Sequence, residues 1–83
     1  MTYRRLSANA IARDDGAVIT RRWLRREPDE PRRCVFVAHG PPALLVSPEL
    51  GTLLEELSAH GINATVRPLV GVYETADEAR EAI

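Results

Sequence analysis

Arginine and tryptophan occur together in one short segment, and these residue types are well suited to binding another macromolecule. The segment runs from Arg21 to Arg26 and holds the single tryptophan, Trp23. If it is a strand, its side chains alternate, so Arg21, Trp23 and Arg25 share one face. Guanidinium groups form forked hydrogen bonds with carboxylates and phosphates and also stack on aromatic rings. The predicted partner-binding residues are Arg21, Arg22, Trp23, Arg25 and Arg26.

The charge of the chain is strongly polarised along its length. All 11 basic residues are arginines, and nine of them lie in residues 1–33 beside five acids, a formal charge of +4. Residues 34–83 hold two arginines and seven acids, a formal charge of −5, so the whole chain carries −1. A GC-rich genome would explain the use of arginine in place of lysine, but not its location. The polarity therefore favours a basic surface in the N-terminal part.

Three interpretations of the segment around Trp23 remain open. In the first, it is a protein-binding hot spot, since tryptophan and arginine dominate such sites. In the second, a nucleic-acid base stacks on the indole while the arginines hold phosphates. In the third, Trp23 anchors the core and the aliphatic stems of the arginines cover it. The net charge of −1 and the neighbouring acids disfavour nucleic acid. These acids are Asp14, Asp15, Glu27, Asp29 and Glu30.

A second candidate surface is acidic and lies near the C-terminus. Its residues recur at i, i+3, i+4 and i+7, which is one face of a helix. They could bind a basic partner, or imitate a phosphate backbone and block a nucleic-acid channel, as small inhibitors from mobile elements do. They could also be a solvated face, or pair with the arginine segment within one copy or between copies of a homo-oligomer. The four acids are Glu74, Asp77, Glu78 and Glu81.

Catalytic chemistry has little support in the sequence. Cys34 and His39 are five residues apart on a predicted strand, so they point to opposite faces. With His60 on a different element, they have no recognisable metal-ligand spacing. The segment Gly40–Pro42 lacks the backbone N–H groups of a phosphate cradle. We therefore expect no enzymatic activity, no cofactor and no metal.

Size and cysteine content predict a single small domain over residues 1–83, with a thin core. One cysteine excludes an internal disulfide and fits a reducing compartment. No apolar run approaches the roughly 18 residues of a membrane span, and no apolar block follows Arg4 and Arg5 as in a signal peptide. The expected location is the cytoplasm.

A hairpin is predicted at Asp14-Asp15-Gly16, because Asp-Gly lies between two strand-forming runs. A three-residue loop with Gly16 in the left-handed region would pair Ile11 with Ile19, which we prefer; a two-residue loop would pair Ile11 with Thr20. The competing interpretation is a helix over 17–27, but Val18, Ile19 and Thr20 disfavour it. Residues 1–8 give no clear signal.

Downstream of a turn at 27–31, the pattern predicts strands over 34–39, 43–46, 63–67 and 69–73. Ser47 and Pro48 begin the clearest helix, which Gly61 ends. A capping box from Thr75 to Glu78 begins a second helix, which continues to the C-terminus. The apolar stripe of the first helix consists of Leu50, Leu53, Leu54 and Leu57.

The predicted fold is a small α+β domain: an N-terminal β-hairpin followed by β-α-β-β-α, with a mostly antiparallel sheet and two helices. The second part resembles a ferredoxin-like, or split βαβ, unit that lacks its last strand, whose place the hairpin could fill. The predicted function is a small non-enzymatic binding protein, such as an adaptor, inhibitor or regulatory subunit, that contacts a protein partner through the hairpin.

Overall fold

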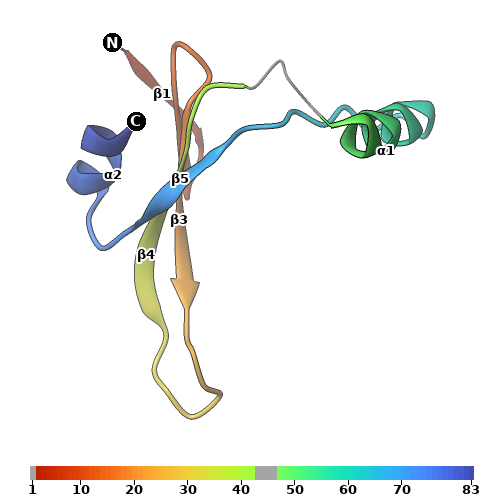
Figure 1. The fold of residues 1–83 in the computed structure, drawn as a ribbon. Coiled ribbons are helices and arrows are strands. Elements are labelled where there is room, and N and C mark those ends of the chain that lie inside the picture. Colours follow the sequence, from red (N-terminus) through yellow and green to blue (C-terminus); the bar gives the residue numbers. More distant parts are fainter. Residues whose placement is uncertain (1, 43–46) are drawn as a thin grey trace.

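The described residues of this computed structural model, 2–42 and 47–83, form one five-stranded antiparallel sheet and two helices (Figure 1). The elements are β1 (Tyr3–Ser7), β2 (Ala10–Arg13), β3 (Val18–Leu24), β4 (Arg33–His39), α1 (Pro48–Ala59), β5 (Leu69–Tyr73) and α2 (Ala76–Ala82). The strands lie in the sheet in chain order, β1-β2-β3-β4-β5. The expected α+β class is therefore confirmed.

The turn between β2 and β3 is the predicted one. Gly16 has a φ of 94°, in the left-handed region that favours glycine. The N–H of Gly16 donates to the carbonyl of Arg13, and Ile11 faces Ile19 across the two strands. The hairpin with a three-residue loop is thus confirmed, and the alternative helix over 17–27 is wrong.

An ion pair next to this turn holds it closed. The Arg13 guanidinium donates to both carboxylate oxygens of Asp15, at 2.8 and 2.6 Å. One of those oxygens also accepts from the backbone N–H of Ala17. The Arg13 hydrogen bonds, with help from Ala17, lower the pKa of Asp15 to about 2 from its ordinary 3.8.

The ferredoxin-like topology expected from the sequence is wrong. β1 to β4 form a continuous meander, and β5 returns antiparallel beside β4 after α1. The sequence gives no sign of β1, because Arg4 and Arg5 are ordinary surface residues. Its backbone pairs with β2 across a short turn at residues 8–9, with Arg5 facing Ile11. β1 and β5 are therefore the two edge strands of the sheet.

The strand predicted over 63–67 is also wrong. These residues pair with none of the described strands, and Pro68, which follows them, cannot donate a ladder hydrogen bond. The carbonyl of Pro68 accepts instead from the N–H of Gly40, and the Arg67 side chain donates to the carbonyl of Gly16 at 2.8 Å. The short strand predicted over 43–46 lies outside the described residues.

α2 covers one face of the sheet and forms the core with it. Thr75 caps the helix by accepting from the N–H of Glu78, as expected, while its hydroxyl donates to the Glu78 carboxylate. Ala79 of α2 is fully buried against Ile19 and Ala38. Partly buried apolar residues surround these three: Tyr3, Ile11, Phe36, Tyr73 and Ile83.

α1 has the predicted ends but no partner within the described chain. Ser47 caps it by accepting from the N–H of Leu50, and Gly61 follows it with a φ of 77°. None of its residues is buried, and among residues 2–42 and 47–83 it packs against no other helix or strand. Figure 1 shows it set apart from the sheet.

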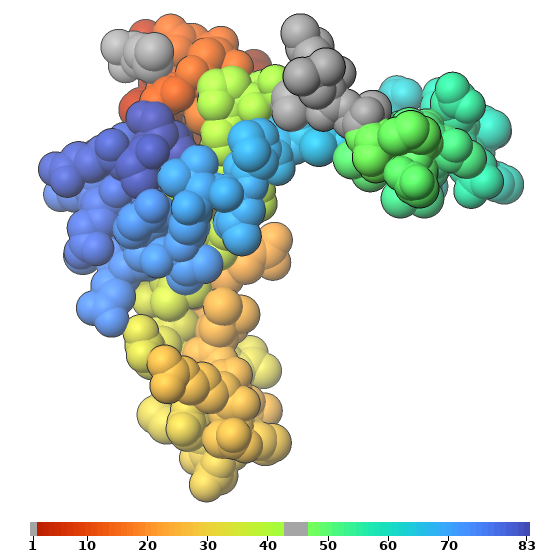
Figure 2. Space-filling model, in the orientation of Figure 1, coloured from red at the N-terminus to blue at the C-terminus, as the bar shows by residue number. Residues whose placement is uncertain are grey.

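Two parts of the molecule project from its centre. Figure 2 shows α1 on one side and the far end of the β3–β4 hairpin at the bottom. The radius of gyration is 14.9 Å, above the roughly 12 Å typical of a compact domain of this length. In the described ranges, no helix is both long and apolar enough to cross a membrane.

Candidate functional site: an arginine arm and a neighbouring pocket

The predicted binding segment lies on the projecting end of the β3–β4 hairpin, which we call the arginine arm and define as residues 21–33. β3 ends at Leu24, and residues 25–32 connect it to β4. Every residue of the arm is exposed. The arm extends beyond the other strands and beyond α2 (Figures 1 and 2), so a partner can approach it from several sides.

Trp23 is a surface residue, not a core residue. Its side chain is 48 % exposed, and it faces Cys34 on β4, which is also exposed. The guanidinium carbon of Arg21 lies 4.9 Å from the centre of the indole ring, within the range of a cation–π contact. The predicted sharing of one face by these two residues is confirmed, and the alternative that Trp23 anchors the core is wrong.

Arg21 is held in place by neutral acceptors. Its Nε and Nη2 donate to Oδ1 of Asn9, at 3.2 and 3.0 Å, and Nη2 also donates to the carbonyl of Ala8 at 3.3 Å. Neither acceptor carries a charge, so Arg21 is oriented without being neutralised. Arg25 lies beyond the end of β3, where strand alternation no longer places its side chain.

Most arginines of the arm have no acidic partner among the described residues. That part of the chain contains three ion pairs, Arg13–Asp15, Arg33–Glu74 and Arg80–Asp77. Only Arg33 of these belongs to the arm, and its pair with Glu74 is well exposed. The cations of the arm outside these three pairs are Arg21, Arg22, Arg25, Arg26 and Arg32. The arm holds six arginines and three acids, Glu27, Asp29 and Glu30, so its formal charge is +3.

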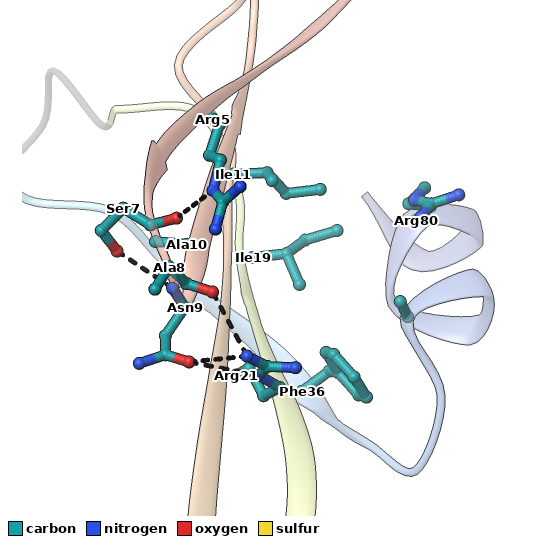
Figure 3. A pocket seen from close by; sticks show the side chains of 11 residues that line it. Arg5, Ser7, Ala8, Asn9, Ala10, Ile11, Ile19, Arg21, Phe36 and Arg80 are labelled. Atoms are coloured by element: carbon teal, nitrogen blue, oxygen red, sulfur yellow. Dashed lines mark hydrogen bonds between the residues drawn. The ribbon is translucent and has the colours of Figure 1, made fainter.

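A pocket of about 240 Å³ lies beside Arg21, on the face of the sheet that α2 partly covers. Ile11, Ile19 and Phe36 form an apolar floor, and Arg5, Arg21 and Arg80 supply charge around it (Figure 3). This combination suits an acidic side chain with an apolar neighbour, because carboxylates bind guanidinium groups and the apolar part is desolvated.

A second hollow lies on the arm itself. It measures about 490 Å³ and opens between the two strands and their connection. Its lining combines apolar and charged residues: Leu24, Arg25, Arg26, Glu30, Arg33 and Val35. Together with the first pocket, it gives the arm concave surfaces at both ends.

The acidic surface predicted near the C-terminus is smaller than expected. α2 begins at Ala76, so Glu74 lies outside the helix and pairs with Arg33. Asp77 pairs with Arg80, and Glu78 accepts from Thr75 at the helix start. Of the four acids, only Glu81 has no partner among the described side chains. The Arg33–Glu74 contact is one internal pair between the basic and acidic parts of the chain.

The titratable residues of β4 do not come together. Cys34 shares a face with Trp23, whereas His39 faces Val18 on the opposite side of the sheet. Neither hollow described above is lined by His39. Within residues 2–42 and 47–83, no three side chains of His, Cys, Asp or Glu are grouped as metal ligands.

No protein-family model, no curated protein and no solved structure matches this chain.

Sequence reasoning missed three residues of this site: Arg5, Asn9 and Arg80. Arg5 and Asn9 belong to the β1–β2 hairpin, which the sequence does not reveal. Arg80 reaches the pocket only because α2 packs across the sheet. The turn residues that precede β2 are the one local signal that could have located Asn9.

Proposed function

We propose that this protein is a small non-enzymatic binding protein, an adaptor, inhibitor or regulatory subunit, whose arginine arm contacts an acidic surface of a protein partner. The observation that carries the proposal is the half-exposed Trp23 beneath the Arg21 guanidinium. Moving a large aromatic ring from water into an interface lowers the free energy, because its apolar surface is removed from water.

The composition of the arm suits a protein interface. Tryptophan and arginine are the residues most enriched among those that dominate binding energy. The Arg21 side chain is already ordered by Asn9, so less conformational entropy is lost when a partner binds it. The remaining arginines favour an acidic partner and would speed its association.

Acids at the end of the arm favour a protein over nucleic acid. Glu27, Asp29 and Glu30 lie in the connection between β3 and β4, next to the arginines. They would repel a phosphate backbone, whereas a protein surface can place cations opposite them. Nucleic-acid binding is therefore the competing outcome that the experiment must distinguish.

The test is affinity capture with tagged protein from nuclease-treated cell extract, compared by quantitative mass spectrometry. Wild type is compared with Trp23→Ala, Arg22→Ala and Arg25→Ala, and with Arg4→Ala as the matched control. Arg4 is an exposed arginine at the other end of the sheet. We expect the same partner to be retained by wild type and Arg4→Ala and lost by Trp23→Ala.

Two results would contradict the proposal. One is equal capture by wild type and Trp23→Ala while circular dichroism shows both to be folded. The other is a gel shift with DNA or RNA that weakens steeply with salt, since counterion release marks phosphate binding. The latter would assign the arm to nucleic acid instead.

A further inference from the structure

The face of the sheet opposite α2 has no helix on it within the described residues, and we call it the open face. Residues paired across antiparallel strands point to the same side, so the register identifies its members. Its apolar members are Ala10, Ala12, Val18, Val35, Val37 and Val72, with Leu24 toward the arm, and Thr20 and His39 share this face. Ala12 and Val35 are already buried, at 5 % and 6 % exposed. Val72 and Leu24 are about half exposed, at 54 % and 49 %. An apolar sheet face of this kind is normally covered.

α1, in turn, has an apolar stripe that no described element of the chain covers. Its stripe of Leu50, Leu53, Leu54 and Leu57 includes no buried residue, and Leu53 is 49 % exposed. A helix of 12 residues is at the limit of what is stable alone in water, since isolated helices below about 12–15 residues are marginal. The helix therefore needs an apolar surface to pack on.

The charges of the two surfaces match. α1 holds Glu49, Glu55 and Glu56 and no arginine. Glu49 and Glu56 flank the leucine stripe, whereas Glu55 lies on the opposite side of the helix. The strand positions of the open face carry three arginines and no acid: Arg4, Arg22 and Arg33, of which Arg33 already pairs with Glu74. Pairing two α1 helices through their leucine stripes would instead bring four flanking glutamates close together, which is unfavourable.

The dimensions also match. At about 1.5 Å per residue, α1 is about 18 Å long. The four gaps between five strands, each about 4.8 Å, span about 19 Å. One helix is thus long enough to cross the whole open face.

Described residues on both sides of α1 are held against the sheet. Before it, Pro42 lies against Gly16, and after it Pro68 lies against Gly40. The Arg67 side chain also binds the carbonyl of Gly16. The chain is thus held at one edge of the molecule on both sides of α1. In the described structure, the helix contacts no strand of its own chain (Figures 1 and 2).

We propose that α1 of one copy packs its leucine stripe on the open face of a second copy, and that the two copies exchange helices in a symmetric dimer. The contact is formed twice, as two-fold symmetry requires. It leaves the indole of Trp23 free, because that side chain lies on the face with α2. The dimer surface shares Arg22 and Leu24 with the arginine arm but leaves the Arg21–Trp23 contact accessible.

The first test is the mass of the intact protein across concentration, by light scattering after size exclusion. Wild type is expected to be a dimer that dissociates on dilution. Leu53→Glu and Val72→Glu should each raise the dissociation constant by about tenfold or more, because each places a charge in an apolar contact. Ala59→Glu adds the same charge to the opposite side of α1 and should have little effect.

The second test identifies which surfaces meet, and it does not depend on how well the charge variants fold. In a Cys34→Ser background, Leu53→Cys and Val72→Cys are placed in separate chains, mixed and oxidised. We expect a disulfide-linked dimer from the mixture and little from either chain alone. Ala59→Cys replaces Leu53→Cys in the control mixture and should not cross-link.

Three results would overturn the proposal. A monomeric wild type at millimolar concentration would exclude the dimer. Efficient cross-linking of Leu53→Cys with itself would show that α1 packs on α1. A chain carrying both Leu53→Cys and Val72→Cys that forms only an internal disulfide would show that the helix folds back on its own sheet.

Discussion

The two helices of this protein begin in the same way and end in very different environments. Ser47 caps α1 and Thr75 caps α2, each by accepting a backbone N–H. α2 is short, yet Ala79 is fully buried in the core. α1 is longer and carries four leucines, yet no residue in it is buried. A cap and a stripe therefore determine that a helix forms and which side is apolar, but not which surface it covers.

The largest effect that tests this comparison is expected at Ala79. Ala79→Asp buries a carboxylate without a partner beside Ile19 and Ala38, and we expect a loss of about 3 kcal/mol or more in the free energy of unfolding. Ala82→Asp is the matched control, because Ala82 is exposed in the same helix. Chemical denaturation measures both, and similar losses in the two variants would contradict the assignment of the core.

A smaller difference is expected between apolar truncations in the two regions. Ile19→Ala empties a core position that is 2 % exposed and should cost about 2–4 kcal/mol at any protein concentration. Leu53→Ala should cost less than about 1 kcal/mol in dilute solution. Its cost should increase with concentration if α1 packs on a second copy. Denaturation curves at two concentrations test this, and a large loss for Leu53→Ala in dilute solution would place α1 in the core of its own chain.

Removing the N-cap of α2 should lower the stability of the whole fold, whereas removing the N-cap of α1 should affect only that helix. Thr75→Ala should lower the free energy of unfolding by about 1 kcal/mol, because α2 unfolds together with the sheet. Ser47→Ala should instead increase hydrogen exchange in α1 and leave the denaturation midpoint of the sheet nearly unchanged. Equal shifts of that midpoint in both variants would show that α1 is coupled to the sheet.

The smallest effect is expected at the turn after β2 and depends on pH. The pKa of Asp15 is about 2 in the folded chain and about 3.8 when unperturbed. A carboxyl whose pKa falls on folding stabilises the fold above its unfolded pKa, and this stabilisation is lost as pH falls through the folded value. Asp15→Asn should thus be less stable than wild type at neutral pH, with the difference disappearing between about pH 4 and 2.

Asp14→Asn is the control for this measurement, since Asp14 forms no ion pair among the described side chains. Thermal melts at several pH values give the comparison. A difference between wild type and Asp15→Asn that persists at pH 2 would mean that Asp15 acts through something other than its charge.

The strands show the same difference between local signals, which were predictable, and packing partners, which were not. Ile11 opposite Ile19 was predictable, because Asp-Gly determines the loop and the loop determines the register. β1 was not predictable, because Arg4 and Arg5 have no strand pattern and depend on β2 for pairing. The reverse error occurred at 63–67, where a strand-like composition found no neighbouring strand among the described residues.

Some features of the candidate site could likewise be predicted from local sequence, and others could not. Strand alternation alone predicts that Arg21 and Trp23 share one face, and their contact follows from it. The exposure of Trp23 could not be inferred, since a small chain with one tryptophan could equally bury it. Arg5 and Arg80 come from the two ends of the chain, and only the packing of α2 on the sheet brings them to one pocket.

By itself, the sequence determined several local features of this protein: that the chain reverses at Gly16, where both helices begin, and which side of α1 is apolar. These depend on residues within a few positions of one another, such as a cap and the N–H that it satisfies. Only the tertiary structure decided that the strands form a meander, that α2 and not α1 covers the sheet, and that the indole remains in solvent. Those outcomes depend on which distant segments pack together. Several apolar surfaces compete for each packing site, so the sequence of one segment alone does not decide the result.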